Sequence, residues 1–198
     1  MKKLKYQERK VGFLDVIKEV SKNLDKNRET INFDKINELI DLIVRTYGKN
    51  HMVFIYGAGR SGFIGRCFAQ RLMHLGIKSC FISDTITHRF HSHDLLIVIS
   101  GSGETTSPVA IVKKAKDIGG KIVLITSNPY STIANASDLI IQIEGKSKIE
   151  AAEVETLAPY TTLFDIAALT ILDSIGAILM KILGINEKDI DNRHASIE

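Results

Sequence analysis

Residues 52–62, Met-Val-Phe-Ile-Tyr-Gly-Ala-Gly-Arg-Ser-Gly, join a short apolar run to a glycine-rich loop. The run 52–56 predicts a buried strand, and the apolar spacing that follows predicts a helix directly after the loop. Four more runs of strand length occur at 80–82, 95–99, 122–125 and 139–143, with helical patterns between them. Strands that alternate with helices imply βαβ units, so we predict an α/β fold with a five-stranded parallel sheet covered on both faces.

Helical patterns also flank this sheet region at both ends of the chain. The first fifty residues predict two leading helices, and residues 160–184 predict a long last helix interrupted by charge only at Asp165, Asp173 and Lys181. A helix so apolar predicts contact with a partner subunit, and hence a homo-oligomer, although a central helix of a monomer would show the same pattern. The length of 198 residues predicts one domain, with its sheet core at 51–145 and a tail at 185–198.

Composition excludes several function classes. The apolar fraction of 44% and charged fraction of 25% are typical of a soluble globular protein. The net charge of +3 is dispersed, which argues against a nucleic-acid partner. No uncharged run approaches the length of a bilayer span and no signal peptide is evident, so we expect a cytoplasmic protein without membrane contact. Cys67 and Cys80 lack a CxxC partner and are predicted to be buried, reduced thiols.

Two loops carry the functional signal. The first spans residues 57–62, and the second, Ser-Gly-Ser-Gly-Glu-Thr at 100–105, follows the third strand and leads to a helix expected to start at Ser107-Pro108. Glycines allow close backbone approach to an anion, while helix-start N–H groups and hydroxyls donate to phosphate oxygens. In a sheet of order 2-1-3-4-5 both loops meet at the switch point, which predicts one phosphate site. Its candidate residues are Gly59, Arg60, Ser61, Ser100, Gly101, Ser102, Gly103, Glu104 and Thr105.

A dinucleotide site is the main alternative. Gly57, Gly59 and Gly62 match G-x-G-x-x-G after a strand, and Asp84 follows the second strand, where a carboxylate for the ribose would lie. An NAD-dependent oxidoreductase would fit this first loop alone. The hydroxyls of the second loop favour the three oxygens of a terminal phosphate monoester, so we prefer a small sugar phosphate as the ligand.

Three segments resemble a known family. Residues 54–61, 65–76 (Gly-Arg-Cys-Phe-Ala-Gln-Arg-Leu-Met-His-Leu-Gly) and 94–105 are similar to the sugar isomerase (SIS) domain, and within it to the 6-phospho-3-hexuloisomerase family. The resemblance extends over nearly the whole chain, including Asn-Arg-His-Ala at 192–195. It implies a flavodoxin-like three-layer α/β/α sandwich, usually a homotetramer, without a redox cofactor. It also implies interconversion of 3-hexulose 6-phosphate and fructose 6-phosphate, in formaldehyde fixation by the ribulose monophosphate pathway or in pentose phosphate supply.

The resemblance also implies catalytic positions. The family's base is a glutamate in Pro-Met-Gly-(Ser/Thr)-x-Phe-Glu, which corresponds here to residues 159–165 and places the base at Asp165. The family's terminal histidine, which reaches a neighbouring subunit's site, corresponds to His194. Aspartate is one methylene shorter than glutamate, Tyr160-Thr161 replaces Met-Gly, and Ser-Asp-Thr-Ile-Thr-His at 83–88 replaces Gly-Glu-x-x-Thr-Pro. These departures leave open a different substrate, or a sugar-phosphate-binding protein that no longer catalyses.

Other titratable residues offer less specific signals. The H-x-x-H-x-H pattern of His88, His91 and His93 suggests a zinc or nickel ligand set, but no further ligand completes a known spacing, so we assign no metal site. We place these histidines in a polar loop on the ligand side of the sheet. The alternative role that we consider for Arg60 is a salt bridge to a helix. We expect Glu104 either to contact sugar hydroxyls or to face solvent. An alternative base could come from Glu150, Glu153 or Glu155.

Overall fold

The chain is represented by a computed structural model that describes residues 5–146 and 155–196. Two helices precede the sheet region, and a long helix follows it, as the sequence predicts. In chain order the elements are α1 (Tyr6–Thr30), α2 (Phe33–Gly48), β1 (Val53–Gly57), α3 (Arg60–His74), β2 (Ser79–Phe81), β3 (Leu95–Ile99), α4 (Thr106–Ile118), β4 (Lys121–Thr126), α5 (Thr132–Ala136), β5 (Leu139–Gln142), α6 (Thr162–Ile182) and α7 (Glu187–Asp191).

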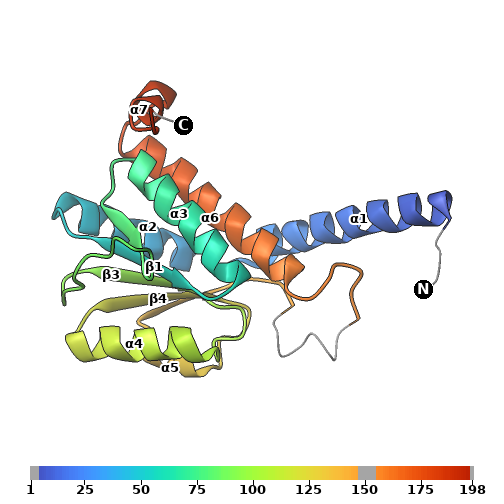
Figure 1. The fold of residues 1–198 in the computed structure, drawn as a ribbon, viewed down its shortest axis with the longest axis horizontal. Coiled ribbons are helices and arrows are strands. Elements are labelled where there is room, and N and C mark those ends of the chain that lie inside the picture. The colour runs from blue at the N-terminus through green and yellow to red at the C-terminus, as the bar shows by residue number, and fades with distance from the viewer. Residues whose placement is uncertain (1–4, 147–154, 197–198) are drawn as a thin grey trace.

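The strands form one parallel sheet in the order β2-β1-β3-β4-β5, which confirms the predicted topology. Helices cover both of its faces (Figure 1): α4 and α5 lie on one side, and α3 and α6 on the other. All residues of β1 and β3 are buried, as their unbroken apolar runs require between two helical layers. The fold is therefore a three-layer α/β/α sandwich.

The register of the central strands aligns the two loops identified in the sequence. Gly57, the last residue of β1, pairs with Ile99, the last residue of β3. The loops that follow these strands therefore start side by side at the carboxyl edge of the sheet. This edge, at the topological switch point, is where open α/β sheets bind their ligands.

The first and last long helices differ most from the sequence expectations. α1 extends away from the body for much of its length (Figure 1), and its first half exposes the apolar side chains of Tyr6, Phe13 and Leu14. α6 has the length and hydropathy of a membrane span, with a mean hydropathy of 1.9, although the sequence suggested no such segment. Half of that stretch is buried, and α6 packs on α1, α2 and α3 as a core helix does.

Two local predictions were wrong. α4 begins at Thr106, with Thr105 as its N-cap residue, so Ser107 lies inside the helix. The helix starts earlier because proline is tolerated throughout the first turn, where its missing N–H has no intrahelical partner. Cys67 is exposed rather than buried because it lies on the solvent side of α3, whereas Phe68 beside it faces the core.

Candidate functional site

A pocket of about 330 Å³ lies at the carboxyl edge of the sheet, where the two loops meet. Its volume falls within the range of small-molecule sites. Seven of the nine predicted phosphate-binding residues line it: Gly59, Arg60, Ser61, Ser100, Gly101, Ser102 and Thr105. The remaining wall comes from Ala58, Ile99, Tyr160, Thr161 and Phe164. The structure thus brings together loops that are forty residues apart in the sequence.

The first loop fits tightly against the start of α3. A Cβ atom at Gly57 would lie 2.7 Å from the backbone oxygen of Ser61, so only glycine allows the loop to fold back this closely. Gly59 is the N-cap residue, with φ +57°, and its lack of a side chain leaves the first N–H groups of α3 without a side-chain cap. These N–H groups and the positive end of the helix dipole are suited to an anion.

The second loop presents hydroxyl groups to the same pocket. The Ser100 Oγ accepts a hydrogen bond from the Gly103 N–H at 3.2 Å, and the Ser102 Oγ accepts one from the Glu104 N–H at 3.3 Å. Because each oxygen accepts from its own loop, each hydroxyl proton is directed elsewhere and can be donated to a ligand. Thr105, the N-cap of α4, makes no side-chain cap hydrogen bond. Because Thr105 lines the pocket, a second helix N-terminus without a side-chain cap lies beside it.

A buried carboxylate lies one hydrogen bond behind the pocket wall. The Asp165 Oδ2 accepts hydrogen bonds from the Arg60 Nε at 2.6 Å and from the Thr161 Oγ1 at 2.8 Å, and both donors belong to pocket-lining residues. Asp165 is 4% exposed, and its Oδ1 is the one buried side-chain atom without a hydrogen-bond partner in the described part of the chain. A buried carboxylate oxygen left without a donor is costly, and such groups are typical of functional sites.

The remaining predicted phosphate-binding residues stabilise the second loop from outside the pocket. Gly103 has φ +65°, and a side chain there would collide with the Ser131 hydroxyl. The Glu104 carboxylate is exposed and accepts hydrogen bonds from the N–H and the hydroxyl of Thr132, both at 2.7 Å. The Thr132 hydroxyl and then its backbone N–H lower the pKa of Glu104. Glu104 therefore fastens the loop to the start of α5 and does not line the pocket.

The family model that matches this chain is the SIS domain, over residues 47–170. The chain belongs to the SIS domain family. An uncharacterised protein of Archaeoglobus fulgidus is 43% identical to it, over 94% of this chain and 98% of its own. The 3-hexulose-6-phosphate isomerase of Methanocaldococcus jannaschii is 42% identical, over 83% of this chain and 84% of its own.

Solved structures agree with this assignment to the SIS family. A hypothetical protein from Methanococcus jannaschii, whose crystal structure led to an inferred function of 3-hexulose-6-phosphate isomerase, superposes with a TM-score of 0.77 at 39% identity. The comparison covers 93% of this chain and 98% of that one. The family resemblance seen in the loop motifs therefore extends to the whole architecture.

Two departures from the SIS-family motifs have unusual backbone geometry. Ser83 replaces a family glycine and has φ +81°, while Tyr160 replaces a methionine and has φ +49°. A non-glycine residue in the left-handed region costs roughly 1–2 kcal/mol. Tyr160, at a position where the sequence departs from the motif, lines the pocket. A strained backbone beside a ligand site points to a functional constraint.

His194 lies far from the pocket of its own chain. Its ring stacks on that of His74, with the ring centroids 4.9 Å apart, at the C-terminal end of α3. Arg60 occupies the opposite end of this helix, which is about 20 Å long at 1.5 Å per residue. The structure therefore does not bring His194 and Asp165 of one chain together.

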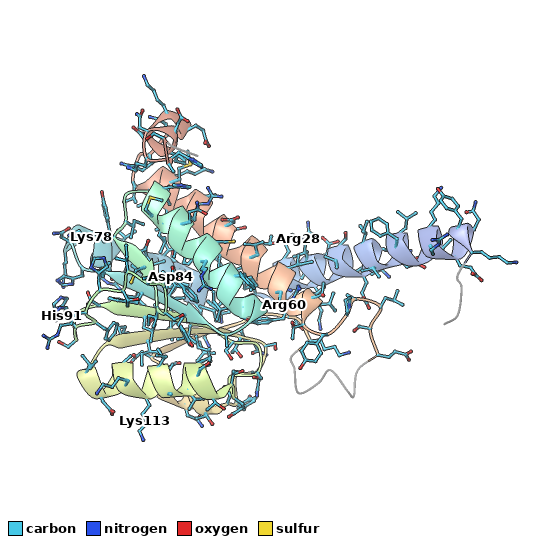
Figure 2. The ribbon with its side chains drawn as sticks, viewed as in Figure 1. Arg28, Arg60, Lys78, Asp84, His91 and Lys113 are labelled. Carbon is cyan, nitrogen blue, oxygen red and sulfur yellow. The ribbon has the colours of Figure 1, made fainter. Side chains whose placement is uncertain are left out.

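His91 and His93 lie at the opposite edge of the sheet, so placing them on the ligand side was wrong, whereas His88 lines a groove beside β2. Figure 2 shows His91 far from Arg60. His91 and His93 follow the loop back to the amino edge, where the ring of His93 contacts that of His51 with centroids 4.1 Å apart. Asp94 binds the backbone N–H groups of Met52 and His91 there. Within residues 5–146 and 155–196, no three His, Cys, Asp or Glu side chains are grouped to hold a metal.

The carboxylates of the alternative interpretations also lie elsewhere. Asp84, which would bind the ribose of a dinucleotide, forms an ion pair with Arg66 at 3.1 Å. Asp84 lines a separate groove beside β2 rather than the pocket. Glu150 and Glu153, considered as alternative bases, lie outside the described residues, and Glu155 is exposed.

Proposed function

We propose that this SIS-family protein is a sugar-phosphate isomerase that interconverts 3-hexulose 6-phosphate and fructose 6-phosphate. The observation that carries the proposal is the pocket itself, in which two helix N-termini without side-chain caps meet three serine hydroxyls and a buried carboxylate lies one hydrogen bond behind. The named isomerase of M. jannaschii, at 42% identity, supports this choice of substrates.

The phosphate would be held by Ser61, Ser100, Ser102 and the N-terminal N–H groups of α3 and α4. These donors are fixed by strands β1 and β3, so they bind the anion without rearrangement of the sheet. The carbonyl end of the sugar would then extend along the wall formed by Tyr160 and Thr161.

The chemistry moves a proton between adjacent carbons. Starting from fructose 6-phosphate, a base removes the proton on C3 and the C2 carbonyl oxygen gains one, which gives an enediol. Return of a proton to C2, with loss of the proton on the C3 oxygen, leaves the carbonyl at C3. No electrons leave the sugar, so the reaction balances without a redox cofactor. We assign the base to Asp165 and the stabilisation of the negatively charged oxygens to the Arg60 guanidinium beside it.

We also propose that the active form is a homotetramer and that His194 of a neighbouring subunit completes the site, by assisting ring opening or proton transfer. The distance between His194 and the pocket of its own chain supports this arrangement. So do the apolar side chains that α1 and α6 leave exposed, including Phe13, Leu14 and Ile182. We expect this assembly to be cytoplasmic.

A sugar-phosphate-binding protein without catalysis is the second candidate, and one contact favours it. The Asp165 Oδ2 is held by both Arg60 and Thr161, on a side chain one methylene shorter than glutamate. An error of about 1 Å in the position of a catalytic group can cost roughly a hundredfold in rate. With the carboxylate so restrained, the protein would bind the sugar phosphate, but Asp165 would not reach the carbon that has to lose its proton.

Thermal unfolding with a panel of ligands, together with turnover, separates these possibilities. Hexose, pentose and heptose phosphates are added in parallel, with inorganic phosphate and NAD as comparisons, because a bound ligand raises the unfolding temperature by mass action. The proposal predicts stabilisation by fructose 6-phosphate and its conversion by the same sample. Stabilisation without conversion would establish the binding protein, and stabilisation by NAD alone would establish the dinucleotide enzyme.

A further inference from the structure

Three polar side chains of α1 form hydrogen bonds with backbone groups that come before and after the segment containing Tyr160 and Thr161, which line the pocket. Glu19, Asn23 and Asn27 are four residues apart, so they lie on the same face of the helix. We call them the polar ladder. Each of them forms hydrogen bonds with backbone groups more than a hundred residues away in the sequence.

Glu19 binds the backbone immediately before the catalytic segment. Its Oε1 accepts a hydrogen bond from the Leu157 N–H at 3.1 Å, and its Oε2 accepts one from the Ala158 N–H at 2.6 Å. Hydrogen bonds to an ionised acceptor are roughly twice as strong as neutral ones. Because both carboxylate oxygens are used, the side chain fixes the direction of the chain as it enters Pro159.

The two asparagines bind backbone groups just after β5 and in the first turn of α6. Asn27 is 3% exposed, accepts from the Glu144 N–H at 2.7 Å and donates to the Glu144 carbonyl at 2.9 Å. The Asn23 amide donates to the Glu144 carbonyl at 3.3 Å and to the Leu163 carbonyl at 3.2 Å. The ladder thus joins the chain just after β5 and the first turn of α6 to one helix.

We propose that the polar ladder is the positioning device of the catalytic half of the site. It sets where Tyr160, Thr161 and Asp165 lie relative to the phosphate loops. The phosphate loops are held by β1 and β3, and among the described residues none of the ladder's hydrogen bonds reaches them. This assignment rests on the proposed isomerase function for its effect on rate, but the geometry it predicts is measurable without turnover.

The test compares two variants of α1 that each remove one carboxylate. Glu19→Gln replaces one of the two accepting oxygens with an amide nitrogen, which cannot accept a hydrogen bond, and removes the negative charge. Asp15→Asn, one helical turn away at an exposed position, is the matched control. Amide hydrogen exchange reports directly on the Leu157 and Ala158 N–H groups that Glu19 binds. We expect their exchange to become at least about tenfold faster in Glu19→Gln and to stay at the wild-type rate in Asp15→Asn.

Kinetics on the same samples separate positioning from binding. Because a shift of about 1 Å in the catalytic segment costs up to roughly a hundredfold, we expect kcat of Glu19→Gln to fall by about ten- to a hundredfold. The Kd for inorganic phosphate should stay within about threefold of wild type, since the phosphate loops are untouched. If Glu19→Gln matches Asp15→Asn in exchange, kcat and Kd, the ladder has no positioning role.

Failure of the proposed isomerase activity would leave this test decisive. If the wild type binds fructose 6-phosphate without converting it, amide exchange and the ratio of the Kd for fructose 6-phosphate to that for inorganic phosphate replace kcat as readouts. The ladder predicts that this ratio rises in Glu19→Gln and stays unchanged in Asp15→Asn. Equal ratios in both variants, with equal exchange, would overturn it.

Discussion

Replacing Asp165 with asparagine should separate activity from stability. Asparagine keeps the shape of the side chain but removes the charge and the proton-accepting oxygen. If Asp165 is the base, kcat should fall by roughly 10²- to 10⁴-fold, the usual contribution of a general base. Substrate binding should remain, because the phosphate donors lie on the other two loops.

The effect on stability can be worked out from the contacts of Asp165. The Asp165 Oδ1 is buried without a donor, and an unsatisfied atom of this kind lowers the free energy of unfolding by about 1–3 kcal/mol. The neutral amide of asparagine reduces this cost. The mutation also weakens the ion pair with Arg60, whose side chain is 63% exposed, so that loss is about 0–1 kcal/mol. The two effects oppose each other. We therefore expect a change within about 1 kcal/mol, or roughly 2–4 °C in Tm.

The matched control is Asp173→Asn. Asp173 pairs with Arg71 at 3.0 Å and, like the pair of Asp165 and Arg60, joins α6 to α3. Its side chain is 45% exposed and does not line the pocket, so Asp173→Asn should leave kcat unchanged. The assays are conversion of fructose 6-phosphate and thermal unfolding. An Asp165→Asn enzyme within threefold of wild-type kcat would refute the assignment of the base. A loss of several kcal/mol would show that the residue is mainly structural.

Three further changes test the loop geometry, the first helix and the pH dependence. Gly57→Ala places a Cβ atom 2.7 Å from the Ser61 carbonyl oxygen, so we expect at least about tenfold weaker phosphate binding and a stability loss of about 1–3 kcal/mol, measured by calorimetry and chemical denaturation. Gly12→Ala, in an exposed turn of α1 where a Cβ atom meets nothing within 4 Å, should raise stability by up to about 1 kcal/mol in the same denaturation assay; destabilisation would contradict a helical conformation there. Partial burial alone would raise the pKa of Asp138, but a backbone N–H and Lys116 outweigh it and hold that pKa below its usual value. Such a group stabilises the fold above the unfolded pKa and loses that contribution as the pH falls through the folded pKa, so Asp138→Asn should cost about 1 kcal/mol at pH 7 and progressively less at acid pH in denaturant titrations.

The sheet could be predicted from the sequence because its signals are local. Each apolar run is bounded by turn residues, and parallel βαβ units allow few topologies. The position of the pocket was also predictable, since glycine and serine clusters follow strands whose order brings them together. Gly57, for example, is identifiable as part of a tight loop from its position after the first strand.

Long-range contacts were less predictable. In the sequence, Glu104 lies within a loop predicted to bind phosphate. Only the fold shows that α5 lies close enough for Thr132 to bind the Glu104 carboxylate. The histidine loop was placed at the wrong edge of the sheet because the sequence does not show where a long connection turns back. Glu19 resembles any charged residue on a helix surface, and its role depends on backbone groups nearly 140 residues away.

We propose that the pocket converts one ketose phosphate into another through an enediol. The most direct measurement is to incubate the purified protein with fructose 6-phosphate in D₂O and follow the sugar by NMR. We expect 3-hexulose 6-phosphate to appear and deuterium to replace the proton on C3 of fructose 6-phosphate. An unchanged spectrum from protein that fructose 6-phosphate stabilises against unfolding would contradict it.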